Sequence, residues 1–134
     1  MHHRDLDLDT TGRQLVDLTA DVRSFCRGLG DGLLNVFVPH ATAGVALFET
    51  GAGTEEDVQV VLDRLLPRDL DWTHQHGSPG HGADHVLPLL VSPSLTIPVR
   101  GGAPELGTWQ SVVLVDRNRD NPHRQVLLRF VAAR

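Results

Sequence analysis

Residues 33–49 read LLNVFVPHATAGVALFE, two apolar runs separated by a proline–histidine pair. The first run is rich in apolar and β-branched residues and predicts a strand over residues 33–38, which Pro39 ends or bends. The second run predicts another strand over residues 44–49. Two apolar strands so close in sequence favour a fold built on a sheet.

Strands and helices are also expected on both sides of this stretch. One helix is expected to be capped by Thr19, and a second begins at Thr54, where Thr54 and Asp57 have capping-box spacing, and stops at Pro67. Residues 68–88 have no periodic pattern and predict a long loop. Further strands are expected at residues 5–9, 14–18, 95–99, 109–115 and 125–131.

This order of elements predicts one α+β domain spanning all 134 residues. The domain is expected to be an antiparallel or mixed β-sandwich with two short-to-medium helices. Its last two strands are expected to form a terminal hairpin around the polar turn at residues 116–123.

Composition excludes several classes of function. Twelve basic residues against seventeen acidic ones give a net charge of -5, which argues against a nucleic-acid partner. No apolar stretch approaches the roughly 20 residues of a membrane span, and no apolar secretory core follows Met1, so a cytoplasmic protein without a membrane partner is expected. The chain has no lysine and no tyrosine, which removes Schiff-base chemistry, the phosphate-loop lysine and a tyrosine acid. Cys26 lies on the apolar stripe of the first helix and is expected to be a buried structural thiol.

Histidine is the residue type that points to a site. His40 follows a predicted strand nine residues before Glu49, and His74 and His85 bracket the long loop eleven residues apart. Three imidazoles with one open position are a common way to hold a divalent ion. Spacing alone does not bring these residues together, so two readings stay open: hydrogen-bonded or solvated loop histidines, and a metal or acid–base site.

Three motifs in a fixed order resemble the YjbQ-like (UPF0047) family, whose attributed activity is that of a secondary thiamine-phosphate synthase. The first is His40-Ala41-Thr42-Ala43 with Glu49 following, and the second is the pair His74 and His85. The third is the stretch LGTWQ at residues 106–110. The resemblance covers nearly the whole chain, with Phe48 and residues 50–53 departing from the family pattern.

The resemblance implies a metal site and a set of residues around it. His40, His74 and His85 would hold a divalent metal, with zinc the ion expected for neutral imidazoles. Glu49 and His40 would be the catalytic residues, Glu49 as a fourth ligand or as a base. The expected substrate-binding residues are Thr42, Gln110 and Arg124.

Alternative readings accompany several of these residues. Gln110 either orients a ligand or forms a cross-strand hydrogen bond, and Arg124 either binds a substrate phosphate or pairs with an acid at the sheet edge. Trp109 is expected in the core. His76 and His81 are expected to be solvated loop residues, although His81 could replace a polar site residue.

The resemblance further implies a homotrimer with sites near the subunit boundaries. The implied reaction joins hydroxymethylpyrimidine diphosphate to a thiazole phosphate with release of pyrophosphate. Two alternatives stay open: a metal-dependent hydrolase of a small phosphorylated or acyl compound, and a non-catalytic trimer that binds a metal or small ligand.

Overall fold

The computed structural model describes residues 1–134 and contains eight strands and three helices. The helices are α1 (Thr19–Cys26), α2 (Thr54–Leu65) and α3 (His81–Leu90). The strands are β1 (His2–Asp9), β2 (Leu15–Asp17), β3 (Gly32–Phe37), β4 (Ala43–Phe48), β5 (Ser94–Arg100), β6 (Ala103–Pro104), β7 (Ser111–Asp116) and β8 (His123–Ala132). The predicted α+β class is confirmed, and every strand pair is antiparallel.

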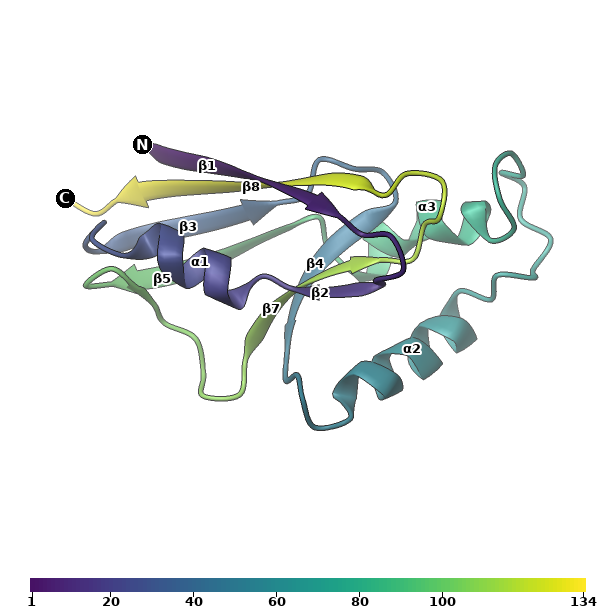
Figure 1. The fold of residues 1–134 in the computed structure, drawn as a ribbon, viewed down its shortest axis with the longest axis horizontal. Helices are drawn as coiled ribbons and strands as arrows, with labels where there is room; N and C mark the ends of the chain where they lie inside the picture. The colour runs from purple at the N-terminus through teal and green to yellow at the C-terminus, as the bar shows by residue number, and fades with distance from the viewer.

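The strands form two sheets. The large sheet has the order β1-β8-β3-β5-β6, and the small sheet has the order β2-β7-β4. The first strand of the chain therefore pairs with the last, and both termini lie at the end of the molecule opposite α2 and α3 (Figure 1).

The main core lies between the two sheets and α1. Along β8 the inward residues Val126, Leu128 and Phe130 are fully buried, and they alternate with residues that face outward. This period of two is what a strand with one covered face requires. Val112 and Leu114 of β7 meet the same core from the small sheet.

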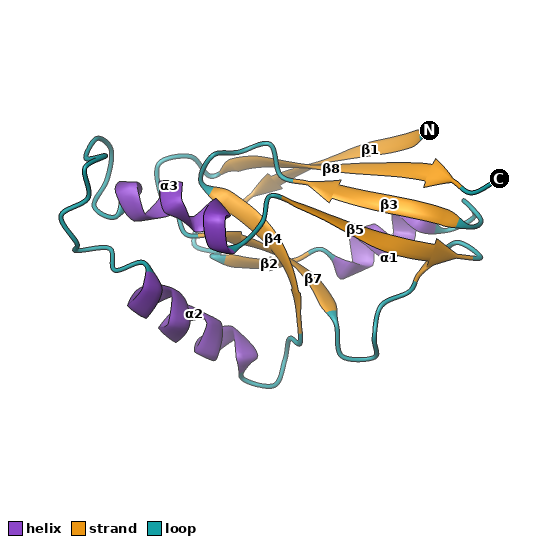
Figure 2. Cartoon of the chain, turned by 180° about the vertical axis from the view of Figure 1, so that it is seen from behind, coloured by secondary structure: helices purple, strands orange, loops and turns teal.

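A second, smaller core covers the other face of the small sheet. Val115 of β7 packs there with Leu62 of α2 and with Leu87 of α3. Residues 112–116 are all buried because β7 has packed elements on both faces, which explains its continuous apolar run. Helices α2 and α3 therefore lie on the same side of the small sheet (Figure 2).

Helix α3 corrects the sequence-based prediction of a loop over residues 68–88. Gly82 and Pro88 weaken the helical signal, since both are poor helix formers. Burial decides the outcome instead, because Ala83 and Leu87 are each 1% exposed against α2 and the small sheet. The fold thus has three helices where two were expected.

The predicted terminal hairpin is also wrong. Strand β7 belongs to the small sheet and β8 to the large sheet, so the turn between them crosses from one sheet to the other. The segment between β1 and β2 makes the same kind of crossing. Polar turns of this length look alike in sequence whether the flanking strands pair or separate.

Two expected helix caps are used differently. Helix α2 begins at Thr54 as predicted, but its N-cap is Gly53 and no side chain caps it. Helix α1 begins at Thr19, whose Oγ1 accepts a hydrogen bond from the backbone N–H of Val112 instead of capping the helix.

Cys26, at the end of α1, is fully buried as expected, and burial raises the pKa of its thiol. With α2 the longest helix at 12 residues, none can cross a bilayer.

Candidate functional site

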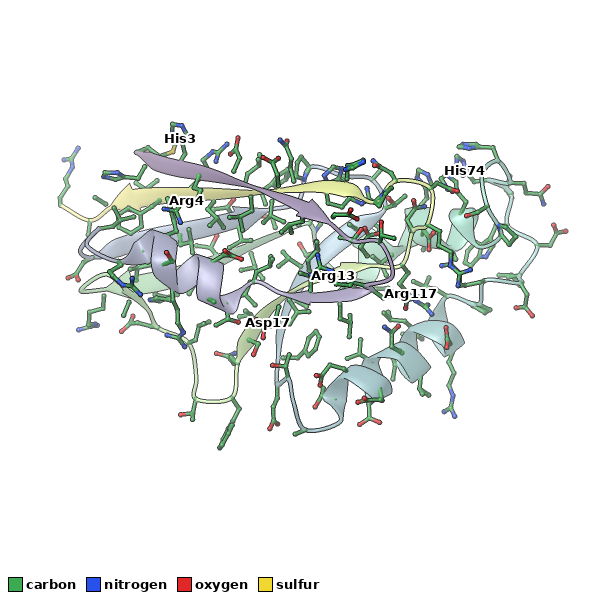
Figure 3. The ribbon with its side chains drawn as sticks, viewed as in Figure 1. His3, Arg4, Arg13, Asp17, His74 and Arg117 are labelled. Atoms are coloured by element: carbon green, nitrogen blue, oxygen red, sulfur yellow. The ribbon has the colours of Figure 1, made fainter.

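Four histidines gather at the start of α3, and we call them the histidine cluster: His74, His76, His81 and His85. His74 and His76 come from the loop before the helix, while His81 and His85 stand four residues apart on one helix face. The ring centroid of His74 lies 4.0 Å from that of His76 and 4.3 Å from that of His85. Figure 3 shows His74 at the α3 end of the molecule.

Two glycines allow the loop to approach the helix this closely. Gly80 has φ +88°, a left-handed conformation that lets the chain turn directly into α3. A Cβ at Gly82 would lie 2.5 Å from the carbonyl oxygen of His74 and 2.5 Å from the Cβ of Trp72. The missing side chain of Gly82 therefore makes room for the segment that carries His74.

Three members of the cluster are placed to bind one metal ion. Ring nitrogens of His74, His81 and His85 all lie within 4.8 Å of one another. The Nε2 atoms of His81 and His85 are 3.0 Å apart. Two imidazoles on a tetrahedral zinc ion, each about 2.0–2.1 Å from it, have nitrogens roughly 3.4 Å apart, so only a small adjustment is needed.

Lowered pKa values keep lone pairs available on two of the imidazoles. Burial, followed by the neighbouring histidines, lowers the pKa values of His74 and His85 below 6.5. The backbone N–H of Ser78 donates to the Asp120 carboxylate and lowers its pKa. Asp120 is therefore ionised at neutral pH, and its Oδ2 lies 2.7 Å from Nδ1 of His81.

The bond to Asp120 fixes the tautomer of His81. An ionised carboxylate can only accept, so Nδ1 of His81 carries a proton, and in the neutral imidazole Nε2 is then the atom with the lone pair. Carboxylate–histidine pairs of this kind orient metal ligands in many zinc sites. A hollow of about 290 Å³ opens beside the cluster, and His74, His76 and His81 are among its lining residues.

The first turn of α3 is anchored by a buried acid. Asp84 is 2% exposed, forms an ion pair with Arg68 and accepts a hydrogen bond of 3.1 Å from Nδ2 of Asn118. The same Asn118 Nδ2 lies 3.2 Å from Nδ1 of His81. Asp84 therefore ties α3 to the loop on one side and to the β7–β8 turn on the other.

His40 lies outside the histidine cluster. Its Nε2 accepts a hydrogen bond of 2.9 Å from the backbone N–H of Gln125, and burial, then Arg124, lowers its pKa. That bond occupies the lone pair a metal would need and puts the proton on Nδ1. The structure thus brings His74 and His85 together within one chain, without His40. Its predicted role as a ligand stays a prediction.

Thr42 and Arg124 belong to a buried polar network. Arg124 donates from Nε and Nη2 to the Asp116 carboxylate at 2.7 and 3.0 Å, and from Nη2 to Oγ1 of Thr42 at 2.7 Å. Thr10 Oγ1 donates to the same carboxylate at 2.9 Å. Of the two readings of Arg124, pairing with an acid is the one present within the chain; contact with a substrate stays a prediction.

Glu49 and Gln110 stand apart from both groups. Thr42 precedes β4 and Glu49 follows it. Seven residues of extended chain therefore separate Glu49 from Thr42 by about 23 Å. Oε1 of Gln110 accepts a hydrogen bond of 2.8 Å from the Gly107 amide, so it closes a local turn. Trp109 is 72% exposed, which corrects its expected place in the core, because β7 begins only at Ser111.

The sequence left His81 open, as a solvated loop residue or as a replacement for a polar site residue, and gave no indication of Asp120. Recognising α3 would have placed His81 and His85 on one face, because they stand at helical i,i+4 spacing. Asp120 is 39 residues from His81 in sequence, so no pattern among neighbouring residues predicts their contact.

Comparison with known proteins gives consistent matches along the chain. The family described as UPF0047 protein YjbQ-like matches residues 4–133. A UPF0047 protein of Mycobacterium tuberculosis strain H37Rv is 65% identical over 126 residues, covering 94% of this chain and 95% of the relative. A UPF0047 protein of Methanothermobacter thermautotrophicus is 32% identical over 127 residues, covering 89% and 87%.

Solved structures also match over nearly the whole chain. A YbjQ-like protein from Sulfolobus solfataricus superposes with a TM-score of 0.90 at 25% identity, covering 98% of this chain and 97% of that one. A hypothetical protein from Aeropyrum pernix has a TM-score of 0.87 at 31% identity, covering 99% and 100%. The chain belongs to the YjbQ-like UPF0047 family.

Proposed function

We propose that the chain is a metal-dependent enzyme acting on a small molecule, with a divalent ion, zinc, held by His74, His81 and His85. One observation carries this proposal: three imidazoles converge so that their nitrogens lie within 4.8 Å of one another. Three neutral imidazoles fit zinc, and sites with three protein ligands leave a fourth position for water or substrate. His81 replaces His40 in the ligand set expected from the sequence.

The residues around the ligands have separate tasks. Asp120 is a positioning residue, because it holds the proton of His81 on Nδ1 and aims Nε2 at the ion. His76 lies next to His74 and lines the adjoining hollow, where its imidazole can accept or donate a proton. A bound zinc ion would supply Lewis-acid chemistry at this point.

The reaction is proposed from the family resemblance. A hydroxymethylpyrimidine diphosphate and a thiazole phosphate would be joined, and pyrophosphate would leave. Hydrolysis of a small phosphorylated compound is the second candidate, since the hollow beside the cluster has room for water or a small polar molecule.

The homotrimer belongs to this proposal as well. Glu49 and His40 are not beside the cluster in their own chain. If they take part in catalysis as predicted, they must reach the cluster of another copy at a subunit boundary. Light scattering after size-exclusion chromatography measures the assembly, and a monomeric protein would remove Glu49 and His40 from the proposed site.

Elemental analysis of purified, untagged protein tests the metal site. Wild type should carry roughly one zinc ion per chain. His81→Ala and His85→Ala should lose it, while His40→Ala should keep it. His123→Ala, on an exposed residue at the start of β8, is the matched control. Loss of metal in His40→Ala with retention in His81→Ala would return the site to the set expected from the sequence.

Activity is assayed separately on the zinc-loaded protein. Thiamine phosphate formation from the two precursors and phosphate release from simple phosphate esters are measured with and without a chelator. Zinc-dependent turnover of either kind supports the proposal. A stoichiometric metal without turnover, and with lowered stability on its removal, would favour the non-catalytic binding protein.

A further inference from the structure

A cavity of about 640 Å³ lies where the chain crosses between the two sheets. Both crossings line it. They contribute residues 10–14 before β2, residue 116 at the end of β7, and residues 117–119 and 122 after β7. None of the ten lining residues is hydrophobic. We call it the arginine cavity, because Arg13, Arg117 and Arg119 lie around it. Figure 3 shows Arg13 and Arg117 near the start of β2.

One guanidinium group of this cavity has hydrogen-bond donors without acceptors. Arg117 is only 5% exposed and forms an ion pair with Asp63 through Nη2. Its Nε and Nη1 are shielded from solvent and have no hydrogen-bond partner. Buried donors without acceptors are rare and costly, so an acceptor would stabilise this side chain. Because these nitrogens are shielded, the guanidinium must shift toward the cavity to meet an acceptor there. Arg13 donates through Nη2 to the Asp9 carbonyl oxygen, and Arg119 is exposed.

The charge around the cavity is positive although the chain carries a net charge of -5. Asp116 is the one acid that lines the cavity, and its carboxylate is already matched by Arg124. Asp63 offsets one guanidinium from α2, and its side chain is 62% exposed. Asp9 lies close enough to Arg13 to interact with its charge, so three guanidiniums face two carboxylates, Asp9 and Asp63. The remaining positive charge favours an anion, and planar guanidiniums suit phosphate oxygens.

We propose that the arginine cavity binds the phosphate or diphosphate group of a small molecule. The β7–β8 turn joins this cavity to the histidine cluster, because Asn118 lines the cavity while its Nδ2 lies 3.2 Å from Nδ1 of His81. Asp120 of the same turn contacts His81. An anion held here would therefore lie against the same turn that contacts His81 of the proposed metal site. The role in catalysis rests on the proposed function, whereas anion binding does not need the metal.

Calorimetric titration of metal-free, chelator-treated protein tests the site. The probes are inorganic phosphate and inorganic pyrophosphate, with sulfate as a comparison for charge alone. Arg13→Gln and Arg119→Gln change exposed residues and should leave the fold intact. Arg23→Gln removes the same charge from the exposed face of α1 and is the matched control.

Pyrophosphate should bind at one site per chain. Arg13→Gln and Arg119→Gln should each weaken its affinity about 5- to 20-fold, the loss of a charge-assisted contact at a partly exposed site, while Arg23→Gln should not. In nitrogen-15 NMR the backbone amides of Arg117 and Asn118 should shift on saturation. Tighter binding of pyrophosphate than of phosphate indicates a diphosphate group, and the reverse order a monophosphate.

Two results would overturn the proposal. One is the absence of saturable binding by either phosphate probe at millimolar concentration. The other is equal affinity in Arg13→Gln, Arg119→Gln and wild type. Because the titration uses metal-free protein, failure here is distinct from failure of the histidine site, which elemental analysis measures independently.

Discussion

Arg124→Met is expected to destabilise the fold strongly, because the guanidinium belongs to a buried ion pair. Arg124 and Asp116 are 3% and 1% exposed, and three hydrogen bonds leave the guanidinium for Asp116 and Thr42. Methionine keeps much of the apolar stem and removes the charge. The Asp116 carboxylate would then stay buried with only two hydrogen bonds, from Oγ1 of Thr10 and from the backbone N–H of Asn118.

The expected loss is about 3–5 kcal/mol in the free energy of unfolding, the usual cost of removing one partner of a buried pair. A chain of this length has a total stability of roughly 7–20 kcal/mol, so the loss is a large share of it. The melting temperature should fall by about 6–20 °C. The double variant Asp116→Leu/Arg124→Met removes both charges and should recover part of the loss.

Urea unfolding followed by circular dichroism measures these differences. The control is Arg129→Met, which breaks an ion pair with Asp5 whose side chains are 28% and 45% exposed. Pairs this exposed contribute at most about 1 kcal/mol. If Arg124→Met lowers the free energy of unfolding no more than Arg129→Met does, the buried network does not support the fold. That result would favour the interpretation of Arg124 as a substrate contact.

Three further predictions concern the site and its surroundings. Burial lowers the pKa of His40 below 6.5, so the unfolded chain takes up a proton that the folded chain resists, and stability falls as the pH drops below 6.5. His40→Gln should therefore lose less free energy of unfolding between about pH 7 and pH 5 than wild type in urea titrations, and an equal loss would contradict this. Asp120→Asn should weaken zinc affinity about 10- to 100-fold in chelator competition, because the carboxylate no longer orients its histidine; unchanged affinity would count against its positioning role. Gly82→Ala should cost about 1–3 kcal/mol and weaken zinc binding, since the new Cβ would push against the backbone of His74 and the side chain of Trp72. Thermal unfolding and elemental analysis measure both effects, and a fully stable, metal-replete variant would refute the steric argument.

The strands were largely predictable because their signal is local. The apolar runs at residues 33–38 and 44–49 correspond to β3 and β4 within one residue at each end. Apolar residues concentrate in these short runs because the strands bury their side chains, and this pattern can be read from neighbouring residues alone. How the strands pair was less predictable, since the crossings between sheets at residues 10–14 and 117–122 depend on contacts that are distant in sequence.

Helix α3 was hidden because its stability comes from packing. Gly82 reads as a helix breaker, yet its lack of a side chain is what lets the His74 loop lie against the helix. The same position is unfavourable for the isolated helix and necessary for the site. Without the helix, His81 is expected in a solvated loop or as a replacement for a polar site residue, and its pairing with Asp120 cannot be foreseen.

The buried pair of Asp116 and Arg124 connects fold stability with both proposed sites. Asp116 ends β7, Arg124 opens β8, and the turn between them supplies Arg117 to the arginine cavity and Asp120 to the histidine cluster. The ion pair closes the base of this turn, so it fixes the positions of side chains that it does not touch. Loosening it should weaken zinc and pyrophosphate binding together, in proportion to the lost stability. Removal of a ligand such as His81→Ala should abolish zinc binding alone.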